Sequence, residues 1–275
     1  MSPTVLHVSP HPDDEVVGSP AALLHLLDRG WRVVSVITSL GFEGDRKRRR
    51  AEAEEASARA GFVPVFFDPP LDLNLEADLA LATHRVATEL PAIVEEHGAS
   101  IVVSPSPHDV HHGHEAVGRG VQRAMAVLPP TLRWWMWAVW GDLPAPNVFY
   151  PFDERVVDRC VHILNAYAGE LERNDYRRLI SGRAAANAVL GSERVFGFGS
   201  AAASSLAYAE VLTEVRLMDG HFLASEPHQL DEGPFPDSGF DVDLTPWLDS
   251  PSVRELVGRI REVRPDGVPG QGAVT

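Results

Sequence analysis

The sequence predicts an α/β fold: a Rossmann-like, mostly parallel sheet with helices on both faces and an elaborated C-terminal portion. Short apolar, β-branched segments alternate with helix-like segments through the first 140 residues, which is typical of βαβ units. Right-handed crossovers place the carboxyl ends of all such strands at one edge of the sheet. Two clusters of histidines and carboxylates directly follow two of these strands, at the edge where parallel sheets bind ligands.

Local signals predict the individual elements of the first half. The expected strands are apolar and β-branched runs at 4–9, 31–38, 63–67, 100–104 and 131–140. The expected helices between them cover 21–29, 45–60, 75–97 and 115–128. Ser19 and Pro20 mark the start of the first helix, and Gly30 and Gly61 mark the ends of the first two. Pro91 predicts a break or a new start in the third helix, because proline removes a backbone donor.

The second half of the chain is less regular. We expect helices at 152–180, 181–190 and 251–263, loops at 197–205 and 231–249, and a strand or a helix at 208–218. Neither an internal repeat nor a linker is visible, which predicts one domain over 1–275. We expect a metal-binding core over 1–140, a substrate-side elaboration over 141–263 and a flexible tail over 264–275.

Composition and charge exclude several classes of protein. Lys and Arg number 24 against 39 Asp and Glu, and the resulting formal charge of −15 disfavours a nucleic-acid partner. Cys160 is the single cysteine, which excludes an internal disulfide and a zinc site built from cysteines. No apolar run approaches the ~18 residues of a membrane helix, and Met1 to Val8 lacks the pattern of a secretory signal. We therefore expect a cytoplasmic protein without a membrane partner.

The turn after the first strand carries imidazole and carboxylates instead of glycine. A dinucleotide-binding domain needs a glycine-rich turn there, but the first glycine is Gly18, which disfavours a nicotinamide oxidoreductase. His11 and Asp14 are three residues apart, a spacing that puts both side chains on one face of a helix. Imidazole together with carboxylate suits Zn²⁺ or a similar divalent ion.

The segment after the fourth strand supplies further ligands. Between His108 and His114 the chain carries four histidines, together with Asp109. Taken alone, such a cluster could be a surface patch. Because it shares the carboxyl edge with His11 and Asp14, we expect a catalytic zinc site with two histidines and one aspartate as ligands and positions left open for water and substrate.

These residues resemble the PIG-L/LmbE-like family of zinc-dependent de-N-acetylases. The family's first signature, a strand followed by His-Pro-Asp-Asp-Glu, is matched in full by His11 to Glu15. Its second, His-Pro-Asp-His, corresponds to His111 to His114, and the resemblance spans about residues 4–215. Weaker similarities are Arg49, Glu52 and Gly61 after the second strand, and Tyr208 to Glu210 near the end of the domain.

The resemblance implies a role for each matching residue. His11, Asp14 and His114 would bind zinc, or another divalent metal, Asp13 would be the general base, and His111 would stabilise the tetrahedral intermediate. The chain departs from the family at Gly113, where a carboxylate that orients a histidine is usual. We expect Asp109 to replace that carboxylate.

The resemblance also implies the reaction, which is hydrolysis of the N-acetyl group of an N-acetylglucosamine-containing substrate. The substrate would be a small N-acetylated glycoside. Within the family, the chain looks like the actinomycete enzymes that deacetylate the pseudoaglycone of teicoplanin-type glycopeptide antibiotics, and a substrate of that kind would carry a bulky aromatic aglycone. The alternatives are a smaller conjugate, such as a thiol-cofactor precursor or chitobiose, and a non-catalytic metal- or sugar-binding protein.

Four further residues are candidates for substrate contact. They are Arg49, Asp68, Trp137 and Trp140, of which Arg49 could equally be a solvated helix charge and Asp68 a surface acid. In strand geometry Trp135 and Trp137 share one face, whereas Trp134 and Trp140 share the other. The tryptophans would pack in the core or form an aromatic wall for an aglycone. The loop at 197–205 could be a lid over the site.

Overall fold

The computed structural model describes residues 2–74, 77–231, 233, 235–236 and 239–257. Its strands are β1 (Thr4–Ser9), β2 (Arg32–Ser39), β3 (Val63–Leu71), β4 (Ala99–Pro105), β5 (Arg133–Trp137), β6 (Val148–Phe152), β7 (Tyr208–Met218), β8 (His221–Ala224), β9 (His228–Gln229) and β10 (Val242–Asp243). Its helices are α1 (Asp14–Val17), α2 (Pro20–Asp28), α3 (Arg46–Ala60), α4 (Leu79–His97), α5 (His112–Met125), α6 (Glu154–Leu164), α7 (Ala168–Arg173), α8 (Tyr176–Phe196), α9 (Thr245–Leu248) and α10 (Val253–Val257), with a short 3₁₀ turn η1 (Glu43–Asp45) before α3.

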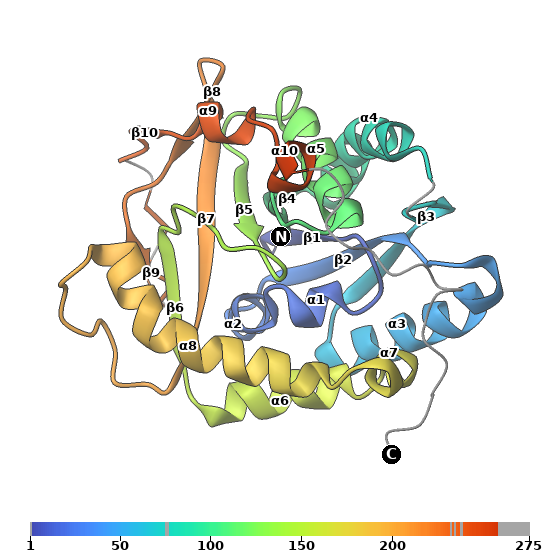
Figure 1. Ribbon diagram of the computed structural model, residues 1–275, viewed down its shortest axis with the longest axis horizontal. Helices are drawn as coiled ribbons and strands as arrows, with labels where there is room; N and C mark the ends of the chain where they lie inside the picture. The colour runs from blue at the N-terminus through green and yellow to red at the C-terminus, as the bar shows by residue number, and fades with distance from the viewer. Residues whose placement is uncertain (1, 75–76, 232, 234, 237–238, 258–275) are drawn as a thin grey trace.

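The first five strands form a parallel sheet in the order β5-β4-β1-β2-β3. Strand β7 adds to β5 in antiparallel orientation, and β8 and β10 continue the sheet beyond it (Figure 1). The first half of β7 pairs with β6 and the second half with β5 and β8, so this one long strand joins the C-terminal portion to the parallel core. The predicted Rossmann-like α/β architecture is confirmed.

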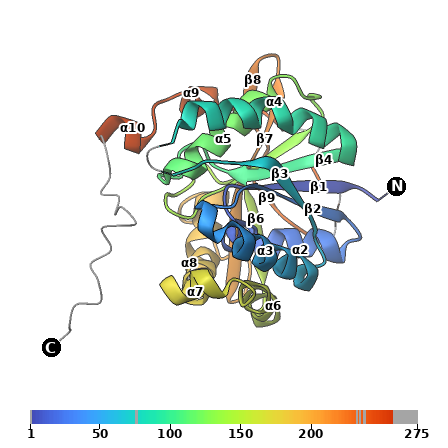
Figure 2. The same cartoon turned by 90° about the vertical axis from the view of Figure 1, so that its right-hand side faces the viewer.

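Helices cover both faces of the parallel strands. Figure 2 shows α4 and α5 on one side, and α2, α3 and α6 on the other. A separate hydrophobic core lies under each layer, and alternate residues of one strand enter opposite cores. Trp135 and Trp137 belong to the core beneath α2 and α6, whereas Trp134 belongs to the core beneath α5. The prediction for these three tryptophans is therefore confirmed.

All five expected strands exist, although two of them end at unexpected residues. Strand β3 continues past Phe67 to Leu71, and β5 ends at Trp137. Trp140 consequently lies in the loop after β5 and is 46% exposed. Placing it on a strand face with Trp134 was wrong, because the backbone leaves the sheet after Trp137.

The expected break at Pro91 is also wrong. Helix α4 runs through Pro91 without interruption. Leu90 and Val94, on either side of it, are buried in the core that α4 shares with α5. Tertiary packing of this apolar face keeps the helix continuous despite the missing donor.

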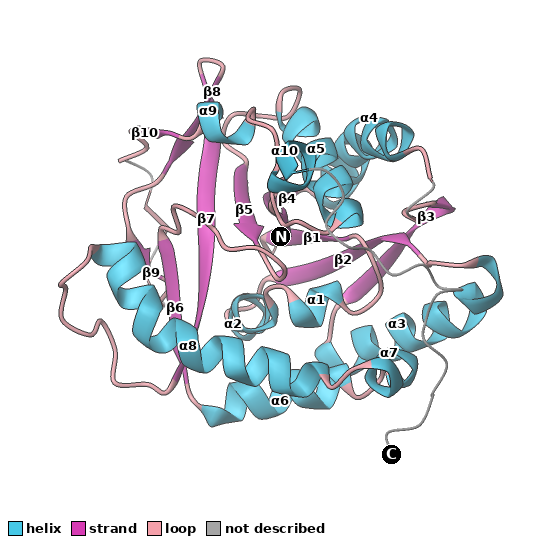
Figure 3. Ribbon diagram, in the orientation of Figure 1, coloured by secondary structure: helices cyan, strands magenta, loops and turns pink. Residues whose placement is uncertain are grey.

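The C-terminal portion differs most from expectation. A helix over 152–180 was wrong, since β6 ends at Phe152 and α6, α7 and the start of α8 follow as separate helices along one side of the molecule (Figure 3). Helix α8 includes the expected 181–190 segment, and 208–218 is a strand. The region 197–205 is a loop, whereas 231–249 contains β10 and α9. Of the last expected helix, 253–257 is helical; 258–263 and the predicted tail at 264–275 lie outside the described residues.

Strand order determines where a ligand site can form. Strands β1 and β4 are neighbours, and the chain leaves their carboxyl ends toward opposite sides of the sheet. This reversal is the position at which open α/β sheets bind ligands. Within the part of the chain that the structure describes, no helix is long and apolar enough to cross a membrane.

Candidate metal and active site

The turns that follow β1 and β4 bring the two histidine-rich segments together. Nδ1 of His11 lies 3.2 Å from Oδ2 of Asp14. The other oxygen of Asp14, Oδ1, lies 3.2 Å from Nε2 of His114 on α5. Asp14 therefore bridges the two turns, and the three predicted metal ligands lie side by side.

His111 belongs to the same cluster. One nitrogen each of His11, His111 and His114 can be chosen so that all three atoms lie within 4.8 Å of one another. This is the group that could hold a metal among the residues that the structure describes. The His111 ring meets the His11 ring edge-on at a centroid distance of 5.1 Å. His111 is thus close enough to contact an ion or a substrate beside it.

Asp109 orients His114. Its fully buried carboxylate lies with Oδ2 2.7 Å from Nδ1 of His114. The other oxygen, Oδ1, accepts hydrogen bonds of 2.8–2.9 Å from the backbone N–H groups of Val139, Trp140 and Gly141. Because the carboxylate holds the proton of His114 on Nδ1, Nε2 is left to face Asp14 and the centre of the cluster.

Gly113 leaves His111 without a comparable partner. Nδ1 of His111 is buried and has no hydrogen-bond partner among the described residues. The space beside Gly113 is small, since a Cβ atom there would lie 3.0 Å from Cε1 of His11. Asp109 therefore supplies a carboxylate to a histidine of this segment, but the histidine is His114 and not His111.

The charges of the cluster fit a bound cation. Burial by itself would lower the pKa of His114, but the charge of Asp14 and the hydrogen bond to Asp109 raise it to about 10. Burial likewise would raise the pKa of Asp14, yet His114 and His11 hold it well below its usual value. Asp14 lies at Nε2 and Asp109 at Nδ1, and these two buried carboxylates, which stabilise a positive charge on the His114 ring, would likewise stabilise a metal ion bound at Nε2. The donor set of imidazoles and one carboxylate is the chemistry that Zn²⁺ prefers.

Asp13 lies beside the cluster in a strained turn. It has a φ of 105°, and its backbone N–H donates to Oε2 of Glu15 at 3.3 Å. The carboxylate of Glu15 is buried, and its other oxygen, Oε1, accepts a hydrogen bond from the hydroxyl of Tyr167, which precedes α7. Val110, in the other site turn, also has a positive φ, of 64°. Strained residues persist where the surrounding structure holds them, and they cluster at functional sites.

The surroundings of Asp13 favour a proton acceptor. Its side chain is buried, and burial, followed by the charge of Asp14, raises its pKa well above the usual value. A carboxylate of raised pKa is a stronger base than one in water. Arg49 opposes this shift by its positive charge.

Arg49 and Glu52 connect α3 to α7. Nη1 of Arg49 lies 2.8 Å from Oε1 of Glu170, and the N–H of Gly169 donates to Oε1 of Glu52 at 3.0 Å. Arg49 is therefore not simply a solvated charge on the helix surface. It lies next to Asp13, and its ion pair with Glu170 connects α7 to the site. Glu170 and Tyr167 could not be predicted from the sequence, since neither belongs to a motif or a periodic pattern.

The other expected substrate contacts lie in different settings. Trp140 is partly exposed, and its ring centroid is 6.3 Å from that of His111. Trp137 is 1% exposed and packs against the rings of His7 and His114, so it supports the cluster from within the core. Asp68 is exposed on β3.

Comparison with known proteins supports the Rossmann-like α/β fold described above. Residues 6–125 match the model of the PIG-L family, described as GlcNAc-PI de-N-acetylase. A Bacillus cereus protein named "Probable N-acetyl-alpha-D-glucosaminyl L-malate deacetylase 2" is 30% identical over 143 residues. The aligned region covers 46% of this chain and 62% of that relative, which is less than two thirds of its length.

Two solved structures share the architecture over most of the chain. The 4-carboxy-2-hydroxymuconate hydratase of Pseudomonas putida KT2440 superposes with a TM-score of 0.57 at 21% identity, covering 78% of this chain and 96% of that one. A triple mutant of the deacetylase of the teicoplanin biosynthetic pathway superposes with a TM-score of 0.58 at 18% identity, covering 78% and 99%. This chain has the fold of the PIG-L/LmbE de-N-acetylases. Because a hydratase shares it, the fold alone does not determine the reaction.

Proposed function

We propose that the protein is a metal-dependent hydrolase that removes the N-acetyl group of an N-acetylglucosamine conjugate. The observation that carries the proposal is the buried carboxylate of Asp13 beside the cluster of His11, Asp14 and His114. A protein that only stored metal would need the ligands, but it would not need a buried base next to them. The match to a de-N-acetylase family over the residues that form this cluster supports the same reaction.

Each residue of the cluster has a definite task in this reaction. Zn²⁺, or another divalent ion held by His11, Asp14 and His114, would polarise the acetyl carbonyl and make water easier to deprotonate. Asp13 takes a proton from water as the water oxygen bonds to the acetyl carbon. Asp13 then returns that proton to the sugar nitrogen as the carbon–nitrogen bond breaks. The products are acetate and a free amine.

His111 stabilises the negative oxygen of the tetrahedral intermediate in this proposal. Burial, followed by the positive charges of His114 and His11, lowers the pKa of His111, so its ring is neutral and carries one N–H. Among the described residues Nδ1 has no hydrogen-bond partner, and one nitrogen of the ring lies within 4.8 Å of nitrogens of His11 and His114, so the ring retains an unused donor or acceptor next to the proposed metal ligands. A single contact of this kind is worth about 3–4 kcal/mol in other enzymes.

For the substrate, we propose a glycopeptide pseudoaglycone of the teicoplanin type. The exposed indole of Trp140, near His111, provides a flat apolar surface for an aromatic aglycone. The structural similarity to the teicoplanin-pathway deacetylase supports this choice. The alternative is a smaller N-acetylglucosamine conjugate, such as a malate glycoside, for which the Bacillus cereus relative is named.

Acetate release from purified, zinc-loaded protein tests the reaction. The substrates are a teicoplanin-type pseudoaglycone, N-acetylglucosaminyl malate and diacetylchitobiose, each with and without a chelator. An unsaturated carboxylic acid tests for hydration. Chelator-sensitive acetate release from one of the sugars is expected. Zinc binding with no acetate from any of them overturns the proposal, and water addition to the acid would favour the hydratase reaction.

The Asp13→Asn variant tests the base. It should keep zinc, because Asp13 is not a ligand, and lose roughly 10²–10⁴-fold in kcat. Asp158→Asn is the matched control, since Asp158 is exposed on α6, away from the site. Full turnover by Asp13→Asn would remove Asp13 from the mechanism.

A further inference from the structure

We propose that Arg183 of α8 is a positioning residue for the metal centre. It holds the backbone of residues 138–141, that backbone holds Asp109, and Asp109 orients His114. The inference rests on the proposed function only in taking His114 as a metal ligand.

The Arg183 guanidinium binds three carbonyl groups of the loop after β5. Nη1 donates to the oxygen of Ala138 at 2.8 Å. Nη2 donates to the oxygens of Val139 at 2.9 Å and of Gly141 at 3.3 Å. A planar guanidinium presents several donors in a rigid fork, so it fixes the orientation of consecutive peptide groups better than a lysine would.

The same loop contacts Asp109 through its amide groups. Val139 and Gly141 each accept a hydrogen bond from Arg183 through C=O and donate one to Oδ1 of Asp109 through N–H. The loop therefore lies between a cation and an anion. The 138–139 and 139–140 peptide groups each present C=O to Arg183 and N–H to Asp109, so two of the three N–H groups that hold Asp109 would rotate with them if they turned away from Arg183.

Asp109 depends strongly on these amide donors. Its carboxylate is fully buried, and its contacts are the three N–H groups and His114. A buried carboxylate that loses hydrogen bonds pays a large desolvation penalty, which it relieves by moving. Such a movement would release Nδ1 of His114 and change the direction of Nε2, the ligand atom.

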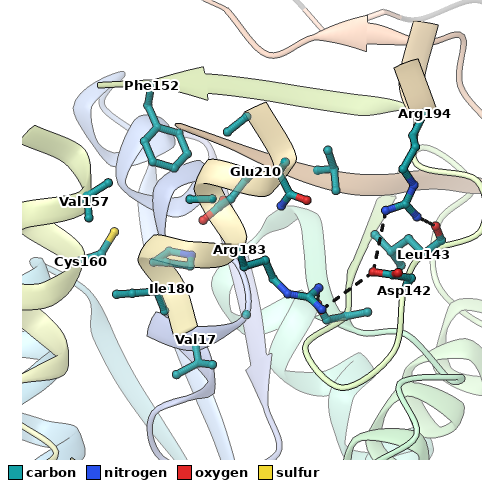
Figure 4. A pocket seen from close by; sticks show the side chains of 17 residues that line it. Val17, Asp142, Leu143, Phe152, Val157, Cys160, Ile180, Arg183, Arg194 and Glu210 are labelled. Carbon is teal, nitrogen blue, oxygen red and sulfur yellow. Dashed lines mark hydrogen bonds and ion pairs between the residues drawn. The ribbon is translucent and has the colours of Figure 1, made fainter. Parts of the chain in front are cut away.

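Arg183 reaches the loop across a cavity. Figure 4 shows its side chain extending from α8 along a pocket that Val17, Ile180 and Leu143 also line. The cavity has a volume of about 50 Å³, enough for a few water molecules. Because direct packing between α8 and the loop is incomplete here, arginine side chains connect the two elements, and Arg183 is the one that reaches residues 138–141.

Arg194 is a matched control on the same helix. It donates to the carbonyl oxygen of Leu143, and Nη1 lies 3.8 Å from Oδ1 of Asp142. These are loop residues as well, but they lie beyond the three amides that contact Asp109. A general loss of contact between α8 and the loop would affect both arginine variants alike, whereas positioning of Asp109 depends on Arg183 alone.

The experiment measures zinc affinity by competition with a chromophoric chelator, which requires no substrate. Arg183→Ala should lose roughly 10–100-fold in zinc affinity, the range for residues that support a metal ligand. Arg183→Lys should lose less, because an ammonium can still bind one carbonyl. Arg194→Ala should stay within about three-fold of the unchanged protein. If Arg183→Ala binds zinc as tightly as the protein without substitutions does, the inference is overturned.

A double-mutant cycle with Asp109→Ala separates positioning from general stability. If Arg183 acts through Asp109, Arg183→Ala should reduce zinc affinity by no more than about three-fold in the Asp109→Ala background. Independent, multiplicative losses overturn the inference. If the alanine variant at position 183 fails to fold by circular dichroism, the same cycle is run with Arg183→Lys. If the protein without substitutions binds zinc but releases no acetate, the proposed function is contradicted. The cycle can still be interpreted in that case, because it measures zinc affinity and not turnover.

Discussion

Replacement of Gly113 by alanine should weaken metal binding without weakening the fold. A Cβ atom at this position would lie 3.0 Å from Cε1 and 3.1 Å from Nε2 of His11. Carbon atoms in contact are normally about 3.5–4.0 Å apart, so the His11 ring must move by about 0.5 Å. Zinc–nitrogen distances tolerate only about 0.2 Å, so this shift is enough to disturb a ligand.

The expected effects on metal affinity and on stability have opposite signs. We expect zinc affinity to fall roughly 10–100-fold, as for other changes that misplace a ligand. Position 113 lies in the first turn of α5 without a positive φ, so alanine should stabilise the metal-free protein by up to about 1 kcal/mol, less the cost of moving the His11 ring. Chelator competition measures the affinity, and urea unfolding of the metal-free protein measures the stability.

Gly182→Ala provides the control. Gly182 lies on α8, and a Cβ atom there would have no neighbour within 4 Å. This variant should gain stability and keep its zinc affinity. Gly113→Ala could bind zinc as tightly as Gly182→Ala does. In that case either the added methyl group does not displace His11 or His11 is not a ligand, and the prediction is refuted.

Three further predictions concern stability and positioning. Tyr167→Phe removes the donor to Glu15, and urea unfolding should show a loss of about 1–3 kcal/mol together with a lower kcat in acetate release; unchanged values for both would contradict the role of this hydrogen bond. Burial raises the pKa of Glu210 to about 7, so the folded state binds more protons than the unfolded state between about pH 4.5 and pH 7. Stability should fall by up to about 3 kcal/mol as the pH rises through that window, and less in Glu210→Gln; equal pH profiles would rule out this source. Gly120→Ala should destabilise by about 1–3 kcal/mol in thermal unfolding, because its Cβ would lie 2.5 Å from Cβ of Val86 where α4 and α5 pack; a gain in stability would show that the helices separate easily.

The sequence predicted features that repeat locally or lie close together along the chain. The alternation of strands and helices in the first half is a periodic signal, and it located all of β1 to β5, although not the ends of β3 and β5. His11 and Asp14 are three residues apart, and Asp109 and His114 are five apart, so each pair was visible as a short motif. The resemblance of these motifs to a family then supplied the roles that are proposed for them.

The long-range contacts that hold the site became visible only in the tertiary structure. Tyr167 and Arg183 lie on segments that carry no motif, and 208–218 fits a strand or a helix equally well by pattern. What brings Arg183 near Asp109 is the packing of α8 beside the loop after β5, a contact between residues far apart in the chain. Residue spacing encodes which face of an element is apolar, but it does not encode which distant element covers that face. The cluster of His11, Asp14 and His114, with Asp109 beside it, could therefore be predicted from the sequence, whereas Tyr167 and Arg183 could not.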